Sequence, residues 1–246
     1  MAQQIFNLPL GTGLEEPVNV LSMTQKLRAN VYIDGFNLYM GALSKTSYKW
    51  LDLERWAKTL MPSYEVGRVV YCTARLIPDA RDVNIHVRQD MYLRAIKTLP
   101  TVQIYEGKFT VQDIRMWRRP EIGCQCCDHL TPVCKCCGGN TIPVIKREEK
   151  GSDVQLAIQL INDGYKQDYD VAHVVSNDSD IQPAVDLVRR ELGRKVIVAD
   201  PRNNKHPSLL GDERRRVRPQ TLGNNQLPAT LLDLNGNTIT KPISWA

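Results

Sequence analysis

Hydrophobic positions along this chain follow two patterns: short unbroken runs, and longer stretches in which apolar residues recur at helical spacing. The unbroken runs predict strands of the kind buried in a parallel sheet, and they occupy residues 28–35, 67–77, 101–111, 170–176 and 194–200. Helical spacing predicts helices from about Asn37 and over residues 52–61, 82–99, 152–167 and 180–192. Residues 141–150 read as a strand or a connector.

The alternation of these elements predicts βαβ units, and therefore an α/β fold with a parallel sheet covered by helices on both faces. Ser152 is expected to cap its helix, and Val154, Ile158 and Ile161 share one face of it. The predicted organisation is an N-terminal arm over 1–27, a main domain over 28–201 with an insertion at about 112–146, and a C-terminal extension over 202–246. An Asn-Gly pair in the extension predicts a hairpin.

Composition narrows the picture only moderately. The 246 residues are 42% hydrophobic, enough for one sizeable core, and the net charge of +5 permits a polyanion partner without requiring one. Basic stretches at 109–120 and 200–219 suit phosphate contacts or a solvated surface. The chain has no apolar run of about 18 residues, which speaks against a membrane partner, and its start lacks a secretory pattern, so we expect a cytoplasmic location. The sequence leaves open whether the protein forms a homo-oligomer.

Six of the seven cysteines lie between residues 124 and 137. Such clustering favours metal binding over dispersed disulfides. Two Cys-x2-Cys pairs, Cys124 with Cys127 and Cys134 with Cys137, suit a closed structural zinc site. The ligand set stays open, because Cys126 and Cys136 are extra thiols and His129 is a possible substitute ligand. Non-metal cysteines and an iron–sulfur cluster are the alternatives.

Several acids stand where predicted strands end or a predicted helix begins. Asp34, Asp178, Asp180 and Asp200 follow strands, and Asp153 opens a helix. Open α/β sheets form their sites at the carboxyl ends of the strands, and crowded carboxylates either raise a pKa or recruit a hard divalent cation. Each acid also has a structural alternative as a turn, cap or first-turn residue. Taken together, the acids predict a metal site.

Three stretches, "VYIDGFNLY", "KGSDVQLAIQLI" and "VVSNDSDIQPAVDLVRRELGRKVIV", resemble the blocks of the NYN domain, a branch of the PIN-like nuclease superfamily. The resemblance covers roughly residues 29–200. It implies a Rossmann-like α/β/α sandwich and a metal-dependent ribonuclease. It also implies that Asp34-Gly35 ends a strand over a metal rather than turning a hairpin.

Carried onto this sequence, the resemblance gives Asp34, Asp153 and Asp178 roles as Mg²⁺ or Mn²⁺ ligands. Asp180 would orient a water molecule, and Asn37 would position ligands. The residues expected to contact substrate are Ser176, Asn177, Arg75, Trp117, Arg118 and Arg119. For Arg75 a surface salt bridge is an equal alternative, and for Trp117 a hydrophobic cap on the insertion.

The expected activity is hydrolysis of RNA phosphodiester bonds by a metal-activated water, without a covalent enzyme intermediate. One alternative is a non-catalytic RNA-binding or regulatory module with the same fold. Another is a phosphatase or DNA nuclease that uses the same carboxylates.

Overall fold

The computed structural model describes residues 26–78, 82–117 and 141–245. Its centre is a seven-stranded sheet in the order β4-β3-β2-β1-β5-β6-β7. The strands are β1 (Arg28–Asp34), β2 (Glu65–Ala74), β3 (Val102–Trp117), β4 (Thr141–Lys150), β5 (Val171–Val175), β6 (Lys195–Asp200) and β7 (Glu213–Arg216). The predicted parallel sheet is mostly confirmed, because every neighbouring pair except β3 and β4 is parallel.

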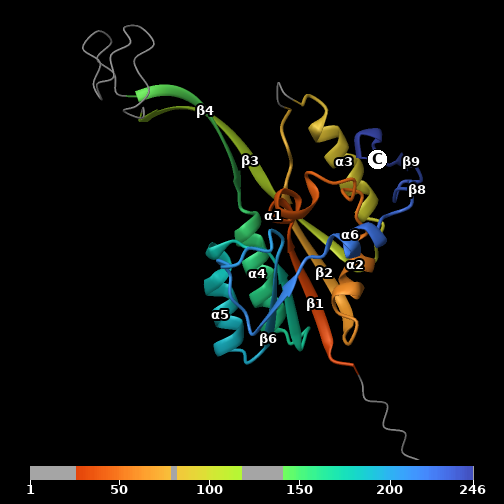
Figure 1. The fold of residues 1–246 in the computed structure, drawn as a ribbon, viewed down its shortest axis with the longest axis vertical. Helices are drawn as coiled ribbons and strands as arrows, with labels where there is room; N and C mark the ends of the chain where they lie inside the picture. Colours follow the sequence, from red (N-terminus) through yellow and green to blue (C-terminus); the bar gives the residue numbers. More distant parts are fainter. Residues whose placement is uncertain (1–25, 79–81, 118–140, 246) are drawn as a thin grey trace, which may run out of the picture.

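Helices cover both faces of the sheet, which confirms the predicted layers (Figure 1). The helical elements are α1 (Gly35–Leu38), the π-helical turn η1 (Tyr39–Leu43), α2 (Leu53–Leu60), α3 (Ile85–Ile96), α4 (Ser152–Tyr165), the 3-10 turn η2 (Ser179–Ile181), α5 (Gln182–Arg190), α6 (Pro219–Asn224) and the 3-10 turn η3 (Ile243–Trp245). Alternation along β1 divides the core: Val31 and Ile33 pack with α2 and α3, whereas Tyr32 packs with α4 and α5.

The antiparallel strand β4 corrects the expectation of an entirely parallel sheet. β3 continues past residue 111, where the strand was predicted to end, and pairs with β4 from Lys108↔Lys150 to Trp117↔Thr141. Both ends of the predicted insertion are therefore strands of one long hairpin, which extends away from the helices (Figure 1). The cysteine segment, with the predicted zinc ligands, lies outside the described residues.

Helix α4 differs from its prediction in two ways. Its N-cap is Gly151, at φ 93°, and Ser152 instead donates a hydrogen bond to the Glu149 carboxylate. The buried apolar side chains are Leu156 and Leu160, whereas Val154 is 60% exposed. Positions two apart on a helix point in nearly opposite directions. The side of α4 that packs on the sheet is therefore the side of Leu156 and Leu160, not that of Val154 and Ile158.

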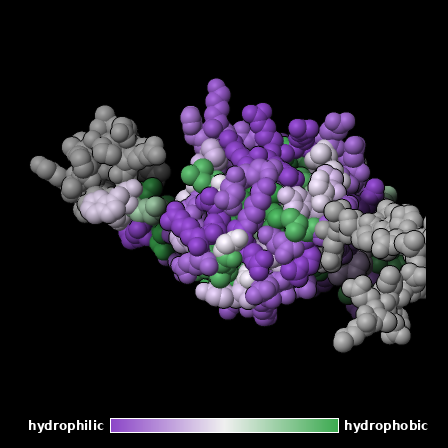
Figure 2. Space-filling model, turned by 90° about the horizontal axis from the view of Figure 1, so that it is seen from below, coloured by the Kyte–Doolittle hydropathy of each residue, from purple (hydrophilic) through white to green (hydrophobic). Residues whose placement is uncertain are grey.

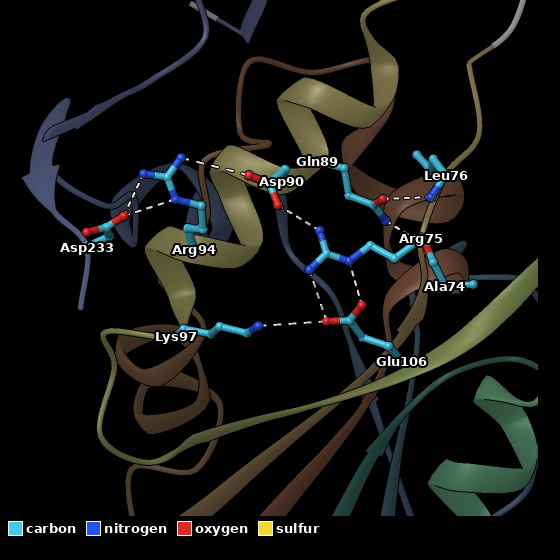
Figure 3. A network of polar contacts seen from close by, with 9 residues as sticks. All are labelled: Ala74, Arg75, Leu76, Gln89, Asp90, Arg94, Lys97, Glu106 and Asp233. Carbon is cyan, nitrogen blue, oxygen red and sulfur yellow. Dashed lines mark hydrogen bonds and ion pairs between the residues drawn. The ribbon is translucent and has the colours of Figure 1, made fainter. Parts of the chain in front are cut away.

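The predicted C-terminal extension packs against the rest of the fold. It supplies β7 to the sheet and the expected hairpin of β8 (Thr230–Leu232) and β9 (Thr238–Thr240), with Gly236 at φ 80° in its turn. Figure 3 shows how the hairpin is attached: Arg94 on α3 pairs with Asp233 before the turn, and with Asp90 one helical turn back. A second anchor is the hydrogen bond of 2.8 Å from the Trp50 indole to the carbonyl of Pro228.

The strands of the parallel part run upward in Figure 1, so their carboxyl ends meet near α1. Figure 2 shows the opposite end of the molecule, which is mostly hydrophilic with small separate hydrophobic groups. Among the described residues, no helix is long and apolar enough to span a membrane. The end that carries α1 is where the predicted acids should meet.

Replacing Asp52 by alanine should destabilise the fold by about 1 kcal/mol, because it removes an N-cap. The Asp52 carboxylate is buried and accepts a hydrogen bond of 2.9 Å from the amide of Arg55 in the first turn of α2. Urea denaturation measures the loss. Asp52→Asn keeps an acceptor oxygen and is the matched control; equal losses in both variants would contradict a capping role.

Candidate metal centre

Three carboxylates meet at the carboxyl-end edge of the sheet. Asp34, Asp153 and Asp178 each offer an oxygen, and these oxygens lie within 4.8 Å of one another. Asp34 ends β1 and Asp178 follows β5; the two strands are parallel neighbours, so their ends coincide. Asp153 is in the first turn of α4, which starts at the same edge because it leads into β5. The sequence prediction that these acids converge is confirmed.

Asp34 is the most buried of the three, at 4% exposed. Its Oδ1 accepts a hydrogen bond of 2.8 Å from the amide of Asn37, and its Oδ2 accepts one of 2.9 Å from the Ser176 hydroxyl. Asp34 thus caps helix α1 instead of turning a hairpin. Burial raises its pKa to about 6, although both hydrogen bonds oppose the rise, and the charges of Glu149 and Asp178 add to it.

Asp153 and Asp178, the other two acids of the cluster, are partly buried. Burial, followed by the charges of Asp34, Asp178 and Asp180, raises the pKa of Asp153 to about 6. Asp178 caps the 3-10 turn η2: its Oδ1 accepts from the amide of Asp180 at 2.9 Å. Asp180 lies next to the cluster and acts on it through its charge. Its predicted role in orienting water stays a prediction.

Glu149 is a site residue that sequence reasoning missed. It stands near the end of β4, is partly buried, and has a raised pKa caused first by burial and then by Asp153. Its charge also raises the pKa of Asp34. The hairpin places it there, because β3 runs beyond the sheet edge and β4 returns to it. The only sequence signal was its position four residues before Asp153.

The oxygen atoms gathered at this site suit the binding of a cation. In the part of the chain that the structure describes, the Oδ1 atom of Asn37 is buried and has no hydrogen-bond partner. A buried oxygen without a partner calls for a cation or a donor. Carboxylate and amide oxygens are the ligands that hard divalent cations prefer. Asp34, Asp153 and Asp178 can therefore hold a divalent cation.

Of the residues predicted to contact substrate, some lie at the acidic cluster and others lie away from it. Ser176 joins Asp34 to the Asp178 amide, which donates to the Ser176 hydroxyl at 3.1 Å. Asn177 accepts from the amide of Ser208 at 2.9 Å. Trp117 is 75% exposed at the outer end of β3. Arg118 and Arg119 lie outside the described residues, and substrate contact by all of these stays a prediction.

Arg75 takes part in the network of Figure 3. Its guanidinium pairs with Asp90 at 2.8 Å and with Glu106 at 2.5 Å. The salt-bridge alternative is thus present in the structure, and substrate contact by Arg75 stays a prediction. Asp200, the remaining strand-end acid, is buried and is not part of the cluster; it accepts two backbone hydrogen bonds from its own loop, at 2.8 and 2.9 Å.

We expect the stability of the protein to fall as pH rises through 6 and a divalent cation to restore it. The Asp34 pKa is raised from 3.8 to about 6 in the folded state, so the folded state holds this proton more tightly than the unfolded state. The stabilisation is complete below pH 4 and lost above pH 6, and it amounts to at most about 3 kcal/mol. Urea denaturation at pH 5 and pH 8, with and without Mn²⁺, tests this. Equal stabilisation by Mn²⁺ at both pH values would contradict it.

Comparison with known proteins finds a match to a nuclease-like domain and a relative that is named as a monooxygenase. The sequence profile of the NYN domain matches residues 138–213. A curated relative from Pseudomonas putida, named 6-hydroxy-3-succinoylpyridine 3-monooxygenase HspA, is 29% identical over 249 residues, covering 90% of this chain and 76% of the relative. A crystal structure of a protein of unknown function from Vibrio parahaemolyticus is similar at 16% identity and a TM-score of 0.46, over 79% of this chain and 94% of that one. The NYN match includes two of the three clustered acids, Asp153 and Asp178, and it supports an NYN domain in this part of the chain.

Proposed function

We propose that this protein is a divalent-metal-dependent endoribonuclease. The observation that carries the proposal is the convergence of Asp34, Asp153 and Asp178 from separate segments, with oxygens within 4.8 Å of one another. The NYN match supports it, because this domain belongs to a nuclease-like family. RNA is the proposed substrate. The proposed location is cytoplasmic.

In this proposal the three aspartates hold Mg²⁺ or Mn²⁺, which when bound polarises a phosphoryl oxygen and lowers the pKa of a water molecule. The chain positions the ligands. Ser176 and the Asn37 amide fix both oxygens of Asp34. Asp180, beside the cluster, orients the attacking water, and the Asn37 side-chain oxygen accepts a hydrogen bond from it. Structural zinc at the cysteine segment remains part of the proposal.

The test is cleavage of single-stranded and structured RNAs by the full chain, with Mg²⁺, with Mn²⁺ and with EDTA, and with an Asp178→Asn variant alongside. We expect cleavage that needs the cation and that the variant loses. If folded, Mn²⁺-bound protein binds RNA and cuts none of the substrates, the function is that of a non-catalytic RNA-binding module. Cutting of single-stranded DNA or of small phosphoesters at a similar rate would reassign the substrate.

A second candidate function follows from the name of the Pseudomonas relative, which acts on a substituted pyridine. The observation that favours it is a cavity of about 170 Å³ beside the acidic cluster, with five aromatic side chains among its mostly apolar lining. Monooxygenation consumes dioxygen and two electrons from a reductant. Oxygen uptake with 6-hydroxy-3-succinoylpyridine and NADH would support this candidate, and RNA cleavage without such uptake would exclude it.

A further inference from the structure

The cavity beside the acidic cluster is lined mainly by α1 with η1, the end of β2, α3 and the C-terminal turn η3, and Glu149 of β4 also lines it. Its walls are mainly apolar, and five of the sixteen lining residues carry aromatic rings: Phe36, Tyr39, Tyr71, Tyr92 and Trp245. Tyr92 is at the centre of this group: its ring meets the ring of Tyr71 edge-on at 6.4 Å, and that of Trp245 at 6.0 Å. Aromatic walls in such arrangements favour a planar, unsaturated ligand.

The volume limits the size of that ligand. An apolar cavity of about 150 Å³ is enough to bind benzene, and this cavity measures about 170 Å³. One six-membered ring therefore fills it, and a fused two-ring system such as a purine does not fit wholly inside it. Ordinary ligand pockets, at roughly 300–1,000 Å³, take whole drug-sized molecules. The cavity is thus a subsite for one part of a ligand.

Polar side chains on the cavity wall fit a ring with heteroatoms. Thr73 offers a hydroxyl, while Lys49 and Arg88 bring positive charge. The Lys49 ammonium donates to the carbonyl of Thr46, and Arg88 pairs with the half-exposed Asp82. A heterocycle with ring nitrogen or carbonyl oxygen atoms can accept hydrogen bonds from such donors, which a hydrocarbon ring cannot do.

The cavity adjoins the acidic cluster through shared residues. Gly35 and Glu149 line it; Gly35 directly follows Asp34, and the charge of Glu149 acts on Asp34. A Cβ atom at Gly35 would lie 2.6 Å from the Tyr71 ring, so only glycine lets this ring stand against the backbone next to the cluster. A substituent on a ring bound in the cavity can reach a cation held by the aspartates.

We propose that this cavity binds one six-membered aromatic nitrogen heterocycle whose anionic substituent reaches the cation at the acidic cluster. A pyrimidine base with its phosphate has this chemistry, and so does a free hydroxypyridine with a carboxylate. The inference does not require that the site cleaves RNA. If the proposed ribonuclease is correct, it adds a pyrimidine preference next to the scissile bond.

Calorimetric titration of the full chain with Mn²⁺ tests the proposal. The probes are uridine 5′-monophosphate, 6-hydroxypyridine-3-carboxylate and, as the size control, adenosine 5′-monophosphate. We expect at least one single-ring probe to bind, and adenosine 5′-monophosphate to bind at least tenfold more weakly than it. The uridine probe identifies a nucleotide site, and the pyridine probe a small-molecule site.

Two variants at Met40 test whether the probe binds in the cavity. Met40 lines the cavity and is 49% exposed, so it stands at the mouth and its replacement leaves the core intact. Met40→Trp should fill the mouth and weaken the single-ring probe at least tenfold, whereas Met40→Leu should change its affinity less than threefold. The proposal is overturned if no single-ring probe binds, if Met40→Trp leaves binding unchanged, or if the purine binds equally well. These readouts are independent of RNA cleavage, so either proposal can fail alone.

Discussion

Asp34→Asn is expected to lower metal-dependent RNA cleavage by at least about 10³-fold. Loss of a residue that only supports metal ligands costs about 10- to 100-fold, and Asp34 is the most buried acid of the cluster itself. The amide keeps one oxygen, but it carries no charge to hold the cation. Single-turnover cleavage in Mn²⁺ measures the effect.

The same substitution should leave the protein folded. The introduced side-chain amide retains an acceptor oxygen for the backbone amide of Asn37, and the change removes a buried charge among carboxylates. At pH 8 without a cation we therefore expect Asp34→Asn to be at least as stable as the wild type, and to gain less from Mn²⁺. A loss of activity with these properties assigns Asp34 to the cation site rather than to folding.

Asp200→Asn is the matched control, because Asp200 is also a buried acid at the end of a central strand. It accepts two backbone hydrogen bonds from its own loop and is not one of the clustered carboxylates. We expect it to lose stability and to keep its cleavage rate per folded molecule. Equal cleavage by wild type and Asp34→Asn, or equal losses in both variants, would contradict the proposed site.

Arg68→Met is expected to destabilise the fold by about 3–5 kcal/mol, the cost of leaving a buried charge without its partner. The partner is Asp163, whose side chain is 1% exposed and accepts from Arg68 and from the Tyr32 hydroxyl. Arg68 also donates to Tyr105 and Gln159. The network joins β1, β2, β3 and α4.

Urea denaturation of Arg68→Met and of the double variant Arg68→Met/Asp163→Leu separates charge from packing. The double variant removes both charges, so it should recover part of the stability lost by the single one. A single variant that loses less than about 1 kcal/mol would show that Asp163 does not need this guanidinium.

The convergence of the acids could be predicted from the sequence, because it depends only on which residues follow the buried parallel strands. A buried strand followed by an acid places that acid at the carboxyl end wherever the strand sits in a parallel sheet. Asp34 and Asp178 satisfy this, and their strands pair directly. Asp200 satisfies it too and yet caps its own loop, so strand-end position alone does not identify a ligand.

Three features could not be predicted, each for a physical reason. Residues 141–150 read as a strand or a connector, but the antiparallel pairing of β4 with β3, which places Glu149, depends on a hairpin that carries alternating polar residues and no core pattern. The buried face of α4 was uncertain because its apolar residues occur on both sides of the helix. Strand β7 is Glu-Arg-Arg-Arg, which no hydrophobic pattern reveals, because it is held at the sheet edge by backbone pairing with β6.

The two terminal strands of the sheet, β4 and β7, have a consequence for self-association. A bare strand edge is a template for pairing with other molecules, and Lys, Arg, Glu and Pro residues are the usual means of blocking it. β7 is entirely charged, and β4 contains Pro143 and ends in Lys-Arg-Glu-Glu-Lys. The sheet is therefore protected at both ends against growth into aggregates, and replacing the β7 arginines by valines would remove that protection on one side.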